Sequence, residues 1–349
     1  MSKFKKPALL IAETIAVFLV TFMLAEITLR VYHHFNPSSI FYDHSYNRYR
    51  GKPGAPDYAF NLNSRGFKDV EFKPAKEAGD YRVLALGASF PFGVVPYQHN
   101  YLTLLEQQLN GSGHQVEVLN MGIPGIGPRH YLALFANEGL QLQPDMVLVS
   151  FFIGNDLTNT PAMGRARFLE YSAVATLIRY LVFLNLKFEG KVVHARRNYD
   201  DNAPTLTAEA YLDIEKKRGM IFMKREPLKR TFADAVGYLV RIREMCDAKK
   251  IALKVAIIPD ELQVNPVLQA KVLNAMNASA DEVDFTLPNR YLHEQLNAHR
   301  IDYIDLLDDF TSASARGALY KPNDSHWNIA GNKLAADILA RYISVEPRR

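Results

Sequence analysis

The chain has 349 residues, of which 48% are hydrophobic and 22% charged, a balance that excludes global disorder and allows one large domain or two smaller ones. The net charge of +4 is small for this length, and no basic stripe is interleaved with aromatic residues, so we expect no nucleic-acid partner. The single cysteine, Cys246, excludes an internal disulfide framework and a cysteine-rich zinc site.

The first predicted element is an apolar N-terminal helix. Three lysines within the first six residues precede the run from Pro7 to Leu29. As a helix this run spans roughly 35 Å, against a hydrocarbon core of about 30 Å. We therefore interpret residues 1–32 as a single-pass membrane anchor. Lysines ahead of the helix predict a cytoplasmic N-terminus and an extracytoplasmic remainder, in the periplasm or at the cell surface.

Two glutamates interrupt this helix, and they leave a second interpretation open. Glu13 and Glu26 lie toward its ends, where a carboxylate costs less than at the bilayer midplane. The apolar run between them is short enough to be the core of a cleaved signal peptide. The residues before Glu26 read Phe-Met-Leu-Ala, which lacks small residues at both −3 and −1, so a retained anchor is favoured.

The sequence pattern after the anchor changes at residue 81. Residues 33–80 are rich in Tyr, Asn, Pro, Gly and Lys, which predicts an extended, partly ordered juxtamembrane segment. Residues 81–345 alternate short apolar runs with helix-length segments. The predicted strands are YRVLALG (81–87), VEVLNMG (116–122), PDMVLVSFFIG (144–154), IALKVAIIP (251–259) and IDYIDLL (301–307), and the predicted helices are 101–110, 128–140, 291–300 and 330–343.

This alternation predicts an α/β fold, a three-layer α/β/α sandwich around a mainly parallel central sheet. In such sheets sites form at the C-terminal ends of the strands. Ser89, Gly122 and Asn155 directly follow or end the first three predicted strands. The sequence therefore places three candidate site residues at one edge of the sheet.

A long insertion, at about residues 157–235, follows the third strand. Its stretch from Tyr171 to Phe188 is apolar, but Arg179 and Lys187 interrupt it, so we do not expect a second membrane span. A core-packing helix is the favoured interpretation, and a lid or membrane-surface helix near the site is the alternative.

Ser89, in VLALGASFPFG, is either a turn residue or a nucleophile at the end of a strand. A serine hydroxyl attacks well only when a base takes its proton and a third group orients that base. His326, in NDSHWNIAG, is the candidate base. Asp324 lies two residues earlier, and in an extended loop it points the same way and can orient the imidazole. Taken singly, Ser89 and Asp324 are more often turn or cap residues than catalytic ones, and His326 is more often a surface or core histidine.

Two other motifs that could explain the residues around Ser89 do not match the sequence at positions that each motif requires. The α/β-hydrolase elbow Gly-x-Ser-x-Gly needs glycine where Pro91 stands. The phosphate-binding loop needs Gly-Lys-Ser/Thr, whereas Gly93 is followed by two valines. The ten histidines are scattered, without the spacing of metal ligands, so we expect neither a metal nor another cofactor.

Four blocks together resemble the SGNH/GDSL hydrolase family, in its membrane-anchored, glycan-modifying bacterial type. They are Gly87-Ala88-Ser89 (nucleophile block), Gly122 in NMGIPG (glycine block), Gly154-Asn155-Asp156 (asparagine block) and Asp324-Ser325-His326 (acid–base block). They cover about residues 81–345, and LNSRGFKDVEF (62–72) is similar to the segment preceding the first strand in membrane-anchored members.

The resemblance implies a set of roles. Ser89 is then the nucleophile, His326 the base and Asp324 its orienting partner. The backbone N–H groups of Ser89 and Gly122, with the Asn155 side chain, are then the oxyanion hole. By our own interpretation, Asp156 is structural and fixes the loop that carries Asn155.

Two departures from the family pattern qualify these roles. Ala88 stands where the family usually has an aspartate that braces the turn, which puts full activity in doubt. Only one residue separates Asp324 from His326, whereas many soluble members have two residues between the acid and the base. The shorter spacing is similar to that of membrane-linked glycan-modifying relatives. Asn323 occupies the alternative position, but an amide is a poorer partner for the imidazole than a carboxylate.

The expected function is an extracytoplasmic, membrane-anchored serine esterase or O-acyltransferase that acts on acyl esters, above all acetyl esters, of a cell-surface glycan. Its expected partners are an acylated substrate, the membrane and, in some settings, a polytopic membrane protein. A lipid-directed esterase or thioesterase is one alternative. A non-catalytic subunit or scaffold of an envelope polysaccharide or membrane complex is another, with Ala88 as a sign of decay.

Overall fold

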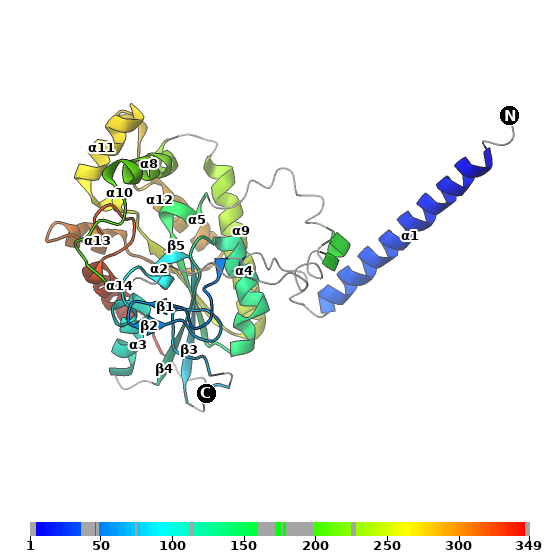
Figure 1. Ribbon diagram of the computed structural model, residues 1–349, viewed down its shortest axis with the longest axis horizontal. Helices are drawn as coiled ribbons and strands as arrows, with labels where there is room; N and C mark the ends of the chain where they lie inside the picture. Colours follow the sequence, from blue (N-terminus) through cyan, green and yellow to red (C-terminus); the bar gives the residue numbers. More distant parts are fainter. Residues whose placement is uncertain are drawn as a thin grey trace. The chain divides into compact units, whose positions relative to one another are not determined.

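The computed structural model describes residues 5–35, 46, 49–73, 75–77, 79–111, 115–158, 172–175, 177–178, 198–224 and 228–345 (Figure 1). The chain divides into two compact units. The helical unit consists of Met1–His44 and Ala162–Lys187, and the sheet unit of Ser45–Pro161 and Phe188–Arg349. Most of the apolar stretch 171–188 lies outside the described residues, so its two interpretations stay predictions.

The helical unit contains α1 (Lys5–Phe35). Within it, Leu9–Tyr32 is long and apolar enough to cross a membrane, with a mean hydropathy of 2.1; a signal sequence has the same properties. The side chain of Glu26, one of the two acidic groups in α1, accepts hydrogen bonds from the backbone N–H groups of Ala173 (2.8 Å) and Val174 (3.1 Å). The apolar N-terminal helix expected from the sequence is therefore present.

The sheet unit is built on five parallel strands in the order β4-β3-β5-β6-β7. Their bounds are β3 (Tyr81–Gly87), β4 (Val116–Gly122), β5 (Met146–Phe152), β6 (Ala252–Ile258) and β7 (Asp302–Asp305). All residues of β3 and β5 are buried, as expected of strands covered on both faces. The predicted parallel sheet is confirmed.

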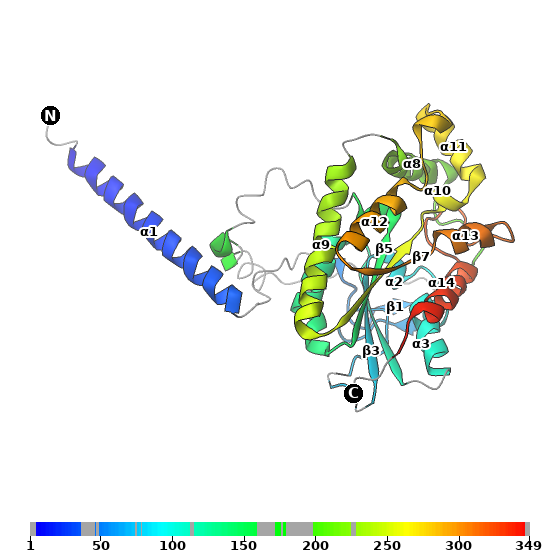
Figure 2. The same cartoon turned by 180° about the vertical axis from the view of Figure 1, so that it is seen from behind.

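Helices cover both faces of this sheet (Figures 1 and 2). On one side, α3 (Tyr101–Gly111) packs against α14 (Ile329–Tyr342). On the other, α4 (Pro128–Asn137) and α12 (Leu287–Ala298) pack against α9 (Leu228–Lys249). The core on the α3 side joins Leu102 and Leu105 to the strand residues Val83 and Val118 and to Ala335 of α14. The three-layer α/β/α architecture is thus confirmed.

The remaining described elements lie in the connections between these strands and helices. They are β1 (Pro56–Asp57), β2 (Phe60–Asn61), α2 (Ser89–Phe92), η3 (Tyr97–His99), η4 (Gly139–Leu142), α5 (Ile153–Asp156), α8 (Ala208–Gly219), η5 (Met220–Phe222), α10 (Glu261–Val264), α11 (Pro266–Met276), η6 (Ala280–Glu282) and α13 (Leu307–Ser314). Of these, α2 and α5 begin directly after the ends of β3 and β5, at one edge of the sheet. They are therefore placed where parallel sheets carry their sites.

Part of the segment expected to be juxtamembrane packs closely within the sheet unit. Tyr46, Phe67 and Lys68 are almost completely buried. The ammonium group of Lys68 forms an ion pair with the buried Asp57, at 2.5 Å. Because an ammonium group is costly to bury unless it is paired, this contact holds the two ends of residues 57–68 together.

Candidate active site

Ser89 begins the short helix α2, two residues after the last residue of β3. Gly87 ends the strand, where a side chain would collide with Pro91 of the turn. Ala88 is buried at 5% exposure, whereas Ser89 is half-buried. The tight strand-to-helix turn therefore presents the Ser89 hydroxyl at the sheet edge, as the sequence predicts.

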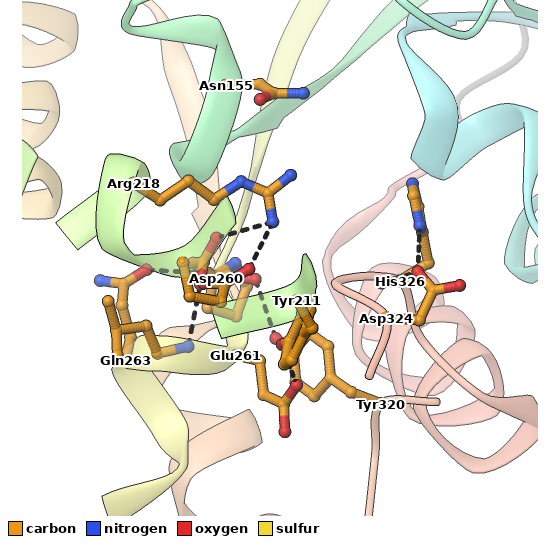
Figure 3. Close-up of polar contacts among 12 residues, drawn as sticks. Asn155, Tyr211, Arg218, Asp260, Glu261, Gln263, Tyr320, Asp324 and His326 are labelled. Atoms are coloured by element: carbon orange, nitrogen blue, oxygen red, sulfur yellow. Dashed lines mark hydrogen bonds and ion pairs between the residues drawn. The ribbon is translucent and has the colours of Figure 1, made fainter. Parts of the chain in front are cut away.

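The C-terminal block brings an imidazole to this hydroxyl. His326 Nε2 lies 2.7 Å from Ser89 Oγ, although 237 residues separate the two in the sequence. His326 Nδ1 lies 2.6 Å from Oδ1 of Asp324, which also accepts the backbone N–H of His326 at 3.0 Å. Ser89, His326 and Asp324 thus form one continuous hydrogen-bonded chain (Figure 3 shows the His326–Asp324 contact).

Asp324 is held in the ionised form. Burial alone raises the pKa of its carboxyl group, but hydrogen bonds from the His326 ring, Thr205 and the His326 backbone, together with the imidazole charge, lower the pKa to about 2. The alternative partner, Asn323, is turned elsewhere and donates from its side chain to the Leu206 carbonyl (3.1 Å). The carboxylate is therefore the group that contacts the imidazole.

Local packing fixes the position of His326. Tyr320 and Trp327 form an isolated antiparallel bridge, and the Lys321 N–H donates to the His326 carbonyl at 3.0 Å. Trp327 is buried, and Phe90 of the nucleophile turn contacts both it (ring centroids 4.7 Å apart) and the His326 ring (5.1 Å). The apolar side chains next to Ser89 and His326 therefore pack together and hold the hydroxyl and the imidazole within hydrogen-bonding distance.

Gly122 ends β4, but its N–H group already has an intramolecular partner. It donates to the Asn120 side chain at 2.9 Å, and a side chain at position 122 would collide with Pro91 and Phe92. The expectation that Gly122 supplies an oxyanion donor disagrees with this arrangement. The glycine instead permits the close approach of the nucleophile turn to β4.

Asn155 lies in the one-turn helix α5 and is half-buried. The next residue, Asp156, is fully buried; its Oδ2 accepts the backbone N–H of Phe152 at 3.0 Å. The Tyr131 hydroxyl lies 2.9 Å from both oxygens of Asp156 and accepts the N–H of Ala88. Burial raises the pKa of Asp156 to about 8. The Tyr131–Asp156 contact therefore links the nucleophile turn to the Asn155 loop, in a molecule that has Ala88 instead of the family's aspartate.

A buried cluster of charged side chains supports the Asn155 loop from below (Figure 3). Asp260, which follows β6, packs so closely on Gly154 that a side chain there would collide with its carboxylate. Arg218 of α8 pairs with Glu215 (2.7 Å) and approaches Asp260 (3.7 Å). Burial and the neighbouring Asp260 raise the pKa of Glu215 to about 9, so this cluster holds a proton at neutral pH. In Figure 3 the Arg218 guanidinium lies between the cluster and Asn155.

Three residues that the sequence analysis did not single out position the nucleophile turn. Lys68 Nζ donates to the carbonyls of Gly93 (3.2 Å) and Val95 (2.6 Å). Asp69 accepts the backbone N–H of Asn120 at 2.7 Å, and the Asn120 side chain donates to the Pro91 carbonyl at 2.7 Å. The signal was the segment LNSRGFKDVEF, in which a Lys-Asp pair is flanked by apolar residues, but the sequence alone assigned it no partner.

Among the described residues, no group of three or more His, Cys, Asp or Glu side chains is arranged to hold a metal ion. The Ser89–His326–Asp324 chain supplies a hydroxyl, a base and a carboxylate that orients the base. With the imidazole as base, a hydroxyl of this kind attacks an acyl carbonyl.

Comparison with known proteins agrees with the sequence resemblance. Residues 221–348 match the family model described as "SGNH hydrolase-like domain, acetyltransferase AlgX". No curated protein matches the chain. Among solved structures, the acetyl xylan esterase AlAXEase is 14% identical, with a TM-score of 0.44 over 76% of this chain and 100% of its own. A lipase/acylhydrolase from Enterococcus faecalis is 15% identical, with a TM-score of 0.40 over 77% and 99%.

The matched segment contains Asp324 and His326 but not Ser89, Gly122 or Asn155. Over residues 221–348 the chain is thus similar to an SGNH hydrolase-like domain, and its described residues have an α/β/α fold.

Proposed function

We propose that this chain, with its SGNH hydrolase-like domain, is a serine-dependent acyl-ester hydrolase or O-acyltransferase that acts on acetyl esters of a cell-surface glycan. The observation that carries this proposal is the chain of two short contacts, 2.7 Å and 2.6 Å, that joins Ser89 through His326 to Asp324. The acetyltransferase in the description of the matching family supports an acetyl group and an acceptor hydroxyl.

In the proposed reaction, Ser89 Oγ attacks the ester carbonyl while His326 Nε2 takes its proton. The tetrahedral intermediate collapses, and His326 returns the proton to the departing alcohol oxygen, which leaves an acyl-Ser89 ester. Water or a sugar hydroxyl then attacks this ester, again with His326 as base. Water gives hydrolysis, and a sugar hydroxyl gives transfer.

Three donors are proposed for the negative charge that develops on the carbonyl oxygen. Two are the Ser89 N–H group and the Asn155 side chain. In the glycine block, the Gly122 N–H donates to Asn120, the Ile123 N–H donates to the Gly87 carbonyl at 3.2 Å, and residue 124 is a proline without an N–H. Gly125 is the next residue; it is exposed, with φ of +81°, and none of the described residues accepts from its N–H. We assign the third donor to Gly125.

The proposed setting is extracytoplasmic, with α1 as a membrane anchor. The apolar length of Leu9–Tyr32 supports an anchor, and the three lysines ahead of it support a cytoplasmic N-terminus. Such an anchor would keep the sheet unit close to envelope glycans and to any polytopic partner that supplies acyl groups.

The test is covalent labelling of the full chain in membranes by a fluorophosphonate, which reacts with activated serines. The wild type is expected to be labelled, Ser89→Ala to lose the label, and Ser312→Ala, an exposed serine on α13, to keep it. Unlabelled wild type from the same preparation is assayed with acetylated oligosaccharides, in water and with an excess of acceptor sugar, because the fluorophosphonate blocks Ser89. Folded wild type that is not labelled would overturn the proposal and favour a scaffold. Turnover of long-chain acyl esters in preference to acetylated sugars would favour the lipid-directed alternative.

A further inference from the structure

A cavity of about 310 Å³ lies beside the carboxylate end of the Ser89–His326–Asp324 chain. Its lining includes Tyr58, Asn198, Tyr199, Asp200, Thr205 and Lys321. The Thr205 side chain is hydrogen-bonded to the Asp324 carboxylate, which in turn contacts His326. Asp324 thus lies between the Thr205 side chain of the cavity wall and the His326 imidazole, whose other nitrogen contacts Ser89.

Two tyrosine rings that line this cavity pack edge to face. The centroids of Tyr58 and Tyr199 are 5.5 Å apart, with the ring planes at 90°. The Tyr58 hydroxyl donates to the Val94 carbonyl at 2.7 Å, and the Tyr199 hydroxyl donates to Asp201 at 2.5 Å. Both rings are half-buried. Each hydroxyl is thus held by a protein acceptor, and Lys68 Nζ lies 5.5 Å from the centroid of the Tyr58 ring.

The backbone around these rings is held in place at some energetic cost. Tyr58 has φ of +56°, in the left-handed region that a bulky residue rarely adopts. Lys321 Nζ donates to the carbonyls of Asp200 (2.5 Å) and Ala203 (2.9 Å) and lies 4.9 Å from the centroid of the Tyr199 ring. Lys321, three residues before Asp324, therefore holds residues 200–203 in place by hydrogen bonds, and the cavity wall is ordered without a ligand. Strained residues that the surrounding structure holds in this way cluster at functional sites.

We propose that this cavity is a binding subsite for one pyranose ring of the glycan, next to the ring that carries the ester. This inference deepens the proposed function and rests on it. The C–H face of a sugar ring packs on an aromatic face, whose electron density is negative. Asn198, Asp200 and Thr205 supply amide, carboxylate and hydroxyl groups for the sugar hydroxyls.

The size and lining of the cavity favour a sugar over an acyl chain. Its volume is at the lower end of small-molecule sites, which suits one ring-sized group. Four of the eight lining residues are polar or charged, the others being two tyrosines, Ala203 and Pro204, so an alkyl chain placed there would desolvate polar groups without forming hydrogen bonds. The sugar ring bound in the cavity therefore packs against Tyr58 and Tyr199 while the neighbouring ring offers its ester to Ser89.

Binding is tested without catalysis, with the full chain in detergent and the Ser89→Ala variant as background. The probes are deacetylated oligosaccharides of a neutral hexose and of a uronic acid, and a long-chain acyl ester. Saturation-transfer NMR and calorimetry are expected to show binding of at least one oligosaccharide. Adding Tyr199→Ala is expected to weaken it about tenfold, whereas Tyr199→Phe, which keeps the ring, retains most of it. Tyr342→Ala, an exposed tyrosine on α14, is the matched control.

Kinetics separate this inference from the proposed function. In an active Ser89 background, Tyr199→Ala is expected to lower kcat/KM for an acetylated oligosaccharide about tenfold more than for a small acetyl ester, chiefly through KM. An equal loss of kcat/KM on both esters would mean that Tyr199 acts only through the catalytic groups, and would overturn the subsite. Oligosaccharide binding that depends on Tyr199, together with a wild-type Ser89 that does not react with the fluorophosphonate, would keep the subsite and overturn the proposed catalysis. Absence of oligosaccharide binding, or binding of the acyl ester alone, overturns the subsite.

Discussion

The ammonium group of Lys68 lies 2.6 Å from the carbonyl oxygen of Val95 and 2.5 Å from the carboxylate of Asp57. This buried side chain thus joins the segment before the sheet to the turn that carries Ser89. Both ends of the ion pair are almost inaccessible to water, so the pair has no alternative solvation.

Lys68→Met is expected to lower the free energy of unfolding by about 3–5 kcal/mol, because it leaves the Asp57 carboxylate buried without its cation. Chemical denaturation of the full chain in detergent measures the loss. The double variant Asp57→Asn/Lys68→Met is expected to recover part of it. A loss below about 1 kcal/mol in Lys68→Met would mean that water reaches the pair.

Asp324→Asn is expected to reduce kcat for ester cleavage by about 10²–10⁴-fold, because the imidazole loses the carboxylate that orients it and stabilises its charge. Asn323→Ala is the control and is expected to change kcat only slightly, since Asn323 contacts the Leu206 carbonyl instead of the imidazole. If the two variants lost activity equally, Asp324 would not be the orienting group.

Asn155→Ala is expected to lower kcat by roughly 10²–10³-fold with little change in KM, as expected when one oxyanion donor is removed. Steady-state kinetics on a small acetyl ester give both constants. A rise in KM with unchanged kcat would assign Asn155 to substrate binding in the ground state.

Asp156 is expected to make stability depend on pH. Its carboxyl group releases its proton near pH 4 when the chain is unfolded but near pH 8 when it is folded. Between these values the folded state holds more protons, so this group's contribution to the free energy of unfolding is complete below about pH 4 and falls as pH rises toward 8. The slope is at most about 1.4 kcal/mol per pH unit.

Asp156→Asn removes this titration. Denaturation of both proteins from pH 4 to pH 9 is expected to show that the stability of the wild type relative to the variant falls up to about pH 8 and is then level. A difference that does not change with pH would show that Asp156 titrates alike in the folded and unfolded chain.

The sequence by itself determined the parallel sheet and the candidate nucleophile and base, Ser89 and His326. The first two strands of the five-stranded sheet, 81–87 and 116–122, were predicted with the bounds that the structure has, because runs of apolar residues and the turns that end them are local properties of the chain. Ser89 and His326 were recognisable because each stands in a short motif next to such a run.

Only the tertiary structure decided which groups these residues meet. That the Gly122 N–H is already used, that Lys68 holds the nucleophile turn, and that Tyr58 and Tyr199 share a cavity depend on contacts between segments distant in sequence. Hydrogen-bond partners and ring packing follow from the three-dimensional path of the backbone, and composition and periodicity describe only neighbours along the chain.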